Sequence, residues 1–131
     1  MKYFAFASNL NKKQMQERCP DAKPVCTAVL PNYSLVFAGW SRQWHGAVAT
    51  IKPAPGQRVR GAIYEVSEAC SHRLDGYEGD SYKRLDVNVF DEDNQPITAY
   101  TYVKVSQLEA GQPSKAYLDT IQQGLRDWRL F

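Results

Sequence analysis

The sequence has no long apolar run, little net charge and few metal-binding side chains. No apolar stretch approaches the roughly 18 residues that a membrane-spanning helix needs, so we expect no membrane anchor. The apolar start before Ser8 and Asn9 is also too short for a secretory signal. Sixteen basic and fourteen acidic side chains leave a formal charge of +2, and they are spread along the chain. Nucleic acid is therefore not an expected partner.

Cysteine and histidine are scarce, which bears on metal sites and on the redox compartment. The three cysteines are an odd number without a C-x-x-C spacing, so neither a disulfide framework nor a zinc knuckle is indicated. Of the two histidines, His72 has Asp75 three residues later, but two further ligands at metal spacing are missing. We therefore expect no metal site, reduced thiols and a cytoplasmic location.

The chain has 131 residues, 44% of them apolar, which suits one domain over residues 1–131. β-rich segments are expected at residues 3–7, 25–30, 33–38, 46–51, 58–66, 82–90 and 97–105, with a hairpin turn at 53–56. Helices are expected over residues 12–18, over 68–78 and from 114 onwards. Because strands and helices do not alternate, we predict an antiparallel α+β domain with its sheet curled into a small barrel.

One carboxylate lies at the C-terminal end of the expected helix over 68–78, where it destabilises the helix. Glu78 lies in the last turn, where the helix dipole is negative, and a carboxylate there costs on the order of 0.3–1 kcal/mol. Like charge from Asp75 and Asp80 and any burial of the carboxyl group both favour the protonated form and raise the pKa of Glu78. Glu78 is therefore either a general base or one member of a solvated acidic patch.

The first expected strand ends in small and polar residues, Ala7, Ser8 and Asn9. Such residues let successive backbone N–H groups point to one side and form an oxyanion hole. The alternative is that Ser8 or Asn9 caps the helix that begins after residue 10. Ser8 is disfavoured as a covalent nucleophile, because no Gly-x-Ser-x-Gly elbow surrounds it. Tyr117, at the start of the last helix, could serve packing or substrate contact.

Five sequence blocks occur in a set order and together span roughly residues 3–125. They are YFAFASNL at 3–10, WHGAVATI at 44–51, RGAIY at 60–64, LDGYEG at 74–79 and SKAY at 114–117. The set resembles the γ-glutamylcyclotransferases, whose first block is similar to Tyr-Phe-Ala-Tyr-Gly-Ser-Asn-Leu. The fourth block resembles the segment that carries that family's catalytic glutamate, and the fifth its Ser-x-x-Tyr motif.

The resemblance implies a small mixed, mainly antiparallel β-barrel with flanking helices. It also implies a cofactor-free enzyme that releases 5-oxoproline from γ-glutamyl amino acids or related γ-glutamyl compounds, so that the expected partner is a small γ-glutamyl substrate. Carried over by position, Glu78 is the catalytic base. The substrate-binding residues that it implies are Tyr3, Phe4, Ala5, Phe6, Ala7, Ser8, Asn9 and Tyr117. A homodimer is an open expectation.

The chain departs from the family pattern at one place in the first block. Phe6-Ala7 stands where the family has Tyr-Gly, which loses a hydroxyl and adds a Cβ. If the glycine position requires a positive φ, Ala7 is strained, and a non-catalytic module that binds a small ligand becomes an alternative. Another alternative is a γ-glutamylamine cyclotransferase, whose opening resembles Tyr-Gly-Thr-Leu-Lys. Ser8-Asn9-Leu10 is closer to the branch that acts on γ-glutamyl amino acids.

Overall fold

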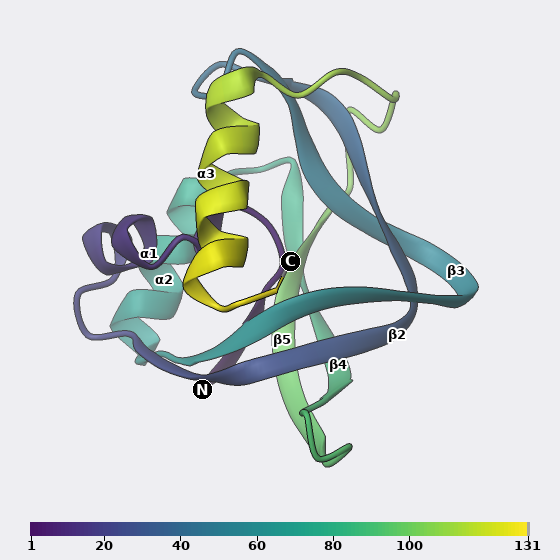
Figure 1. The fold of residues 1–131 in the computed structure, drawn as a ribbon. Helices are drawn as coiled ribbons and strands as arrows, with labels where there is room; N and C mark the ends of the chain where they lie inside the picture. Colours follow the sequence, from purple (N-terminus) through teal and green to yellow (C-terminus); the bar gives the residue numbers. More distant parts are fainter. Residues whose placement is uncertain (131) are drawn as a thin grey trace.

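Five strands close into a small barrel in the computed structural model, which describes residues 1–130 (Figure 1). The strands are β1 (Lys2–Ala5), β2 (Lys23–Ser41), β3 (Gly46–Glu65), β4 (Tyr82–Phe90) and β5 (Pro96–Lys104), and their order around the barrel is β1-β3-β2-β4-β5. All neighbouring pairs are antiparallel except β1 and β5, which pair in parallel where Tyr3 faces Tyr100. The expected mixed, mainly antiparallel barrel is confirmed.

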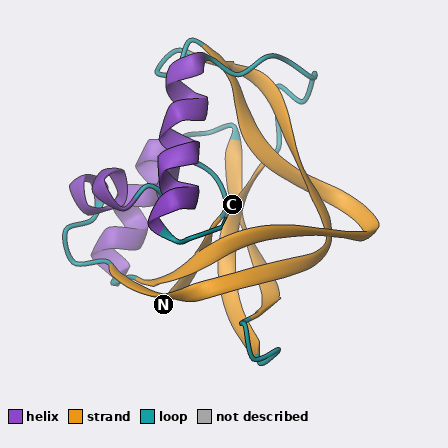
Figure 2. Cartoon of the chain, in the orientation of Figure 1, coloured by secondary structure: helices purple, strands orange, loops and turns teal. Residues whose placement is uncertain are grey.

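The helices gather on one side of the barrel in Figure 2. They are the short 3-10 turn η1 (Ser8–Leu10), α1 (Lys12–Arg18), α2 (Glu68–Glu78) and α3 (Lys115–Asp127). Asn11, Ser67 and Ser114 cap the three α-helices, each accepting a hydrogen bond from the backbone N–H three residues later. Among residues 1–130, none of the helices combines the length and hydropathy that a membrane span requires.

The expected hairpin over residues 53–56 is wrong, because β2 and β3 are two long strands that pair with each other. Pairing continues on both sides of the irregularity, with Pro31 opposite Arg58 and Tyr33 opposite Pro53. Asn32, at φ 66°, accepts a hydrogen bond from Gly56 N–H through its side chain (3.1 Å). The turn residues therefore make a bulge that bends the paired strands without ending them. Five strands result where seven segments were expected.

Side chains alternate along β1 between two apolar clusters. Phe4 points into the barrel, where it packs with Ile63 and Val89. Tyr3 and Ala5 point to the other face, toward the cluster that the helices cover. This alternation is the two-residue period of a strand. Residues that follow β1 consequently emerge at the junction between the barrel and the helices.

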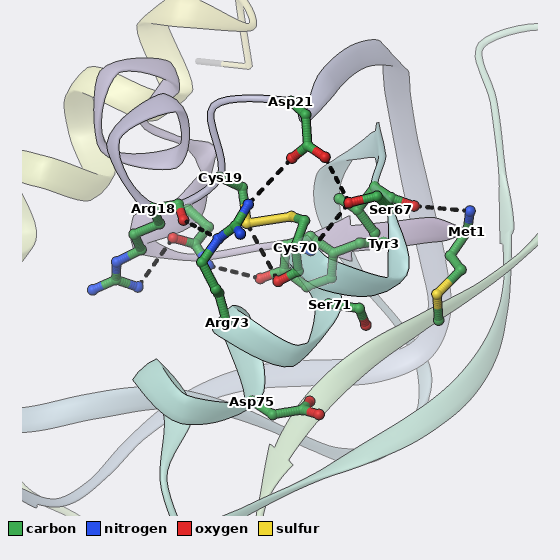
Figure 3. Close-up of a disulfide and its surroundings, with 12 residues drawn as sticks. Met1, Tyr3, Arg18, Cys19, Asp21, Ser67, Cys70, Ser71, Arg73 and Asp75 are labelled. Atoms are coloured by element: carbon green, nitrogen blue, oxygen red, sulfur yellow. Dashed lines mark hydrogen bonds and ion pairs between the residues drawn. A yellow bond between two sulfur atoms is a disulfide. The ribbon is translucent and has the colours of Figure 1, made fainter.

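A disulfide between Cys19 and Cys70 ties α1 to α2 (Figure 3). Cys19 is the C-terminal cap of α1 and Cys70 lies in the first turn of α2, and both side chains are fully buried. Cys26 is free and half-buried. The expectation of three reduced thiols, on which the expected compartment rested, is therefore wrong. An odd cysteine count leaves one thiol over but does not prevent the other two from pairing.

Candidate active site

A cavity of about 150 Å³ opens where the end of β1 meets the helices. Its walls come from the segment after β1, the C-terminal ends of α1 and α2, the turn between β2 and β3, the end of β5 and the start of α3. Six of the lining residues carry the chemistry: Tyr3, Ser8, Asn9, Arg18, Glu78 and Tyr117. The fold thus brings Glu78 and the first sequence block, 70 residues apart in the chain, into one pocket.

The turn η1 presents unpaired backbone donors. Its N-terminal cap is Ala7, whose side chain has no acceptor. Within residues 1–130, no acceptor lies in hydrogen-bonding range of the N–H groups of Ser8 and Asn9. The first N–H groups of any helical turn lack an intrahelical partner, so these two are available to a bound oxygen. The helix-cap alternative does not hold for Asn9, because the side chain that caps α1 is that of Asn11.

Asn9 holds this turn in place with its side-chain amide and its backbone carbonyl. Its Nδ2 donates to Tyr3 Oη (3.0 Å), and its Oδ1 accepts from Gln14 Nε2 and Arg18 Nη1 (both 3.1 Å). Its backbone carbonyl accepts from Tyr64 Oη (2.9 Å). Since Asn9 is only 5% exposed, these bonds replace those that water would supply. The loop is therefore rigid, as an oxyanion hole requires.

The first sequence block divides between pocket and core. Tyr3, Phe6, Ala7, Ser8 and Asn9 line the cavity. Phe4 and Ala5 do not; both are buried in the core, where the carbonyl of Phe4 accepts a hydrogen bond from Thr101 Oγ1 (2.7 Å). Ser8 Oγ accepts from Gln14 Nε2 (2.9 Å), and neither histidine lines the cavity.

Ala7 adopts φ −133°, so it does not have the positive φ that would favour glycine at this position. Replacing Ala7 with glycine should therefore leave the rate of 5-oxoproline release within about twofold. The change should lower the free energy of unfolding by about 0.4–1 kcal/mol, because glycine increases the entropy of the unfolded chain. Steady-state kinetics and urea denaturation measure the two effects. A marked gain in rate would show that the methyl group strains the loop.

Glu78 is the last residue of α2, and Gly79 at φ 76° ends the helix beneath it. Glu78 is half-buried and lines the cavity, and the desolvation of its carboxyl group raises its pKa from the ordinary 4.5 to about 7. The positive charges of Arg18 and Lys104 oppose the rise, whereas Asp75 adds to it only slightly. A carboxyl group with a pKa near neutrality can both accept and return a proton.

Asp75 contributes little because it is neutralised by its neighbours. Arg84 donates two hydrogen bonds to its carboxylate (2.9 and 2.8 Å), and Tyr102 Oη donates a third (2.6 Å). These bonds hold the pKa of Asp75 below its usual value, with Arg84 the largest cause. The expected rise in the pKa of Glu78 is thus present, with burial as its largest cause and the like charge of Asp75 as a smaller one.

Tyr117 both packs and faces the cavity. Its ring lies 5.0 Å from that of Trp44, centroid to centroid, and it is 4% exposed. Its hydroxyl accepts a hydrogen bond from Ala49 N–H (2.9 Å). Within the described part of the chain this hydroxyl donates no hydrogen bond, so it can donate one to a ligand.

Two cations of the site have no counterpart in the sequence prediction. Arg18 is the last residue of the polar helix α1 and carries no local signal that would single it out. Lys104 shares one face of β5 with Tyr100 and Tyr102, which are 5% and 4% exposed. A lysine in register with buried residues of a strand is the pattern that could have revealed it. In residues 1–130, no cluster of three His, Cys, Asp or Glu side chains could hold a metal ion.

Residues 3–129 match the protein family described as "Gamma-glutamyl cyclotransferase, AIG2-like". A protein of Homo sapiens named Gamma-glutamylcyclotransferase is 31% identical over 132 residues, covering 95% of this chain and 70% of the relative. The Mus musculus protein of the same name is 30% identical with the same coverage. A solved structure titled "Gamma-glutamyl cyclotransferase" superposes with a TM-score of 0.94 at 30% identity, covering 98% of this chain and 80% of that one.

Proposed function

Because this chain belongs to the gamma-glutamyl cyclotransferase, AIG2-like family, we propose that it releases 5-oxoproline from γ-glutamyl compounds with Glu78 as the general base. The observation that carries the assignment of Glu78 is its position: a carboxyl group of raised pKa lines the same cavity as the unpaired N–H groups of η1. Base and oxyanion donors are the two requirements of an intramolecular acyl transfer. The whole chain, residues 1–131, acts as one catalytic domain.

The first step makes the substrate's own amine a nucleophile. Glu78, ionised, accepts a proton from the α-ammonium group of the γ-glutamyl moiety. The neutral amine then attacks the γ-carbonyl carbon of the same molecule and closes a five-membered ring. Since nucleophile and electrophile belong to one molecule, holding the reactive conformer supplies much of the rate acceleration.

The second step expels the leaving amine. The carbonyl oxygen becomes an oxyanion, which the N–H groups of Ser8 and Asn9 stabilise, each donor contributing about 3 kcal/mol. The protonated Glu78 gives its proton to the leaving nitrogen and the C–N bond breaks. The ring nitrogen still carries two protons after its attack, and it passes one of them through Glu78 to the departing amine, so that 5-oxoproline and an ammonium group are released. The Tyr117 hydroxyl donates a hydrogen bond to the bound γ-glutamyl group, and the guanidinium group of Arg18 pairs with the α-carboxylate. The substrate's ammonium group supplies the protons and Glu78 transfers them, so these steps require no resident cofactor.

Mass-spectrometric detection of 5-oxoproline tests this function directly. The purified protein is incubated with a panel of γ-glutamyl amino acids and γ-glutamylamines, and 5-oxoproline and the free amine are measured together. We expect the two products in equal amounts from at least one compound. A protein that binds these compounds without releasing 5-oxoproline would instead be the non-catalytic module.

The pH dependence of kcat/KM should report the ionisation of Glu78. Only the ionised carboxylate accepts the proton, so kcat/KM should rise with pH through about 7 and fall tenfold per pH unit well below it. Between pH 8 and pH 5 we expect a loss of about 100-fold. Initial rates across this range, in buffers of constant ionic strength, measure it. A flat profile would exclude Glu78 as the titrating base.

A further inference from the structure

We propose that Lys104 binds a carboxylate on the leaving amine and so makes the enzyme selective for γ-glutamyl compounds whose leaving group is an α-amino acid. This inference rests on the proposed function and assigns the part of the pocket that the reaction itself does not use. It makes Lys104 a specificity-determining residue rather than a catalytic one.

Lys104 is a buried cation without an anionic partner. It is 8% exposed and lines the cavity at the end of β5. Its Nζ lies 3.4 Å from Ser81 Oγ and 4.9 Å from the centre of the Tyr82 ring. Among residues 1–130 no carboxylate lies within ion-pair distance of it, although Glu78 acts on it electrostatically. A buried charge is retained at such a place only if something compensates it, and a ligand carboxylate would do so.

The surrounding backbone is built to admit this side chain. Gly39 adopts φ +68°, and a Cβ there would lie 2.9 Å from Lys104 Cε and 2.7 Å from the carbonyl oxygen of Gln107. The absence of a side chain at Gly39 thus leaves room for the aliphatic part of Lys104 to reach the cavity. At the other end, Thr50 Oγ1 accepts a hydrogen bond from Lys104 N–H (2.9 Å), which fixes where the side chain starts.

Lys104 also lies on a different wall from the other cation. Arg18 comes from α1, donates to Asn9 and covers the ring of Tyr77 at 4.6 Å, beside the turn that holds the γ-carbonyl in the proposed reaction. Lys104 comes from β5 and lies by Ser81 and Gly39, next to the end of β2 where Trp40 is exposed. A group that extends from the γ-carbonyl toward the end of β5 would meet Lys104 rather than Arg18.

The charges of the pocket match a γ-glutamyl amino acid. The pocket holds one carboxylate, Glu78, and two cations, Arg18 and Lys104. A γ-glutamyl amino acid carries one ammonium group and two carboxylates, so each charge has an opposite. A γ-glutamylamine carries only one carboxylate and would leave one buried cation unpaired, which disfavours its binding.

Two substrates that differ only in the charge of interest test the inference. γ-Glutamyl-alanine carries the second carboxylate, and γ-glutamyl-alaninamide replaces it with a neutral amide of the same shape. We expect the parent protein to prefer the acid by at least about tenfold in kcat/KM. Lys104 also lowers the pKa of Glu78, so the comparison is made at about pH 8.5, well above that pKa. There Lys104→Met should lower kcat/KM for the acid by about tenfold or more, chiefly through KM, and change it less than threefold for the amide. Lys52→Met, at an exposed position on β3, is the matched control and should change neither.

The outcomes separate this inference from the function on which it rests. Equal losses on both substrates would mean that Lys104 acts through Glu78 and would overturn the inference, while continued 5-oxoproline release would leave the function standing. No release from either compound by the parent protein would overturn the function and the inference together. If Lys104→Met does not fold, Lys104→Gln retains a polar head beside Ser81 and gives the same comparison.

Discussion

Replacing Glu78 by glutamine should lower 5-oxoproline release by about 10²–10⁴-fold while the protein stays folded. Glutamine keeps the shape of the side chain and can hydrogen-bond, but it cannot take the proton of the α-ammonium group. The nucleophile then remains protonated and the ring does not close. Single-turnover release of 5-oxoproline, with circular dichroism of the same sample, measures both parts. Activity within about tenfold of the parent in a folded sample would remove Glu78 from the mechanism.

The same substitution should stabilise the protein at high pH. Folding raises the pKa of Glu78, so ionising this carboxyl group lowers the free energy of unfolding. The effect is absent below the unfolded-state pKa of 4.5 and develops as the pH rises from there through about 7. At 1.36 kcal/mol per pKa unit, the full loss is roughly 3 kcal/mol once Glu78 is ionised. Glu78→Gln resembles the neutral form, so it should unfold at a higher temperature than the parent at pH 8 and at the same temperature near pH 4.

Asp80→Asn is the matched control for both effects. Asp80 lies two residues beyond Glu78, is exposed and does not line the cavity. The control should retain the parent's activity and show no pH-dependent gain in stability. A gain of equal size in Asp80→Asn would assign the stabilisation to net charge rather than to the burial of Glu78.

Loss of the disulfide should cause the largest fall in stability. The bond closes a loop of 51 residues between Cys19 and Cys70, and the chain-entropy relation gives about 4 kcal/mol for a loop of that length. Replacing both cysteines with alanine should therefore lower the free energy of unfolding by about 2–4 kcal/mol and the melting temperature by on the order of 10 °C. Chemical denaturation and calorimetry measure these changes.

Cys26 provides the control for this experiment. It is free and half-buried on β2, so Cys26→Ala should leave stability nearly unchanged. A reducing agent should reproduce the effect of the double substitution in the parent and have none on the double variant. Equal stability with and without the reducing agent would contradict a stabilising bond between Cys19 and Cys70.

Local signals were sufficient to predict several elements from the sequence. The helix α2 has its predicted bounds because the residue next to each end is a recognisable signal: Ser67 caps the N-terminus and Gly79 ends the helix. The strand β4 follows from the alternation of Leu85, Val87 and Val89 with polar residues. The motif blocks placed Glu78 and the turn after β1, and the fold class followed from the order of elements. Each of these depends on interactions within a few residues of chain.

The misplaced features depend on segments that are distant in the sequence. Residues 53–56 look like a hairpin turn, but they pass through a bulge because residues 30–33 lie opposite them and keep the two strands paired. The prolines are tolerated there because β1 covers β3 only over residues 62–65, which leaves no described strand along that edge. Proline and glycine show where a backbone is irregular, whereas the neighbouring strand decides whether it ends.

The sequence by itself determined the α+β class, the bounds of the helix that carries Glu78 and, through five ordered motifs, the family of the protein. Only the tertiary structure decided that Cys19 pairs with Cys70, that burial is the largest cause of the raised pKa of Glu78, and that Arg18 and Lys104 line the same cavity. The physical reason is that pairing, desolvation and charge compensation depend on distances in space. Those distances are set when the barrel closes and the helices pack against it, which no short window of sequence contains.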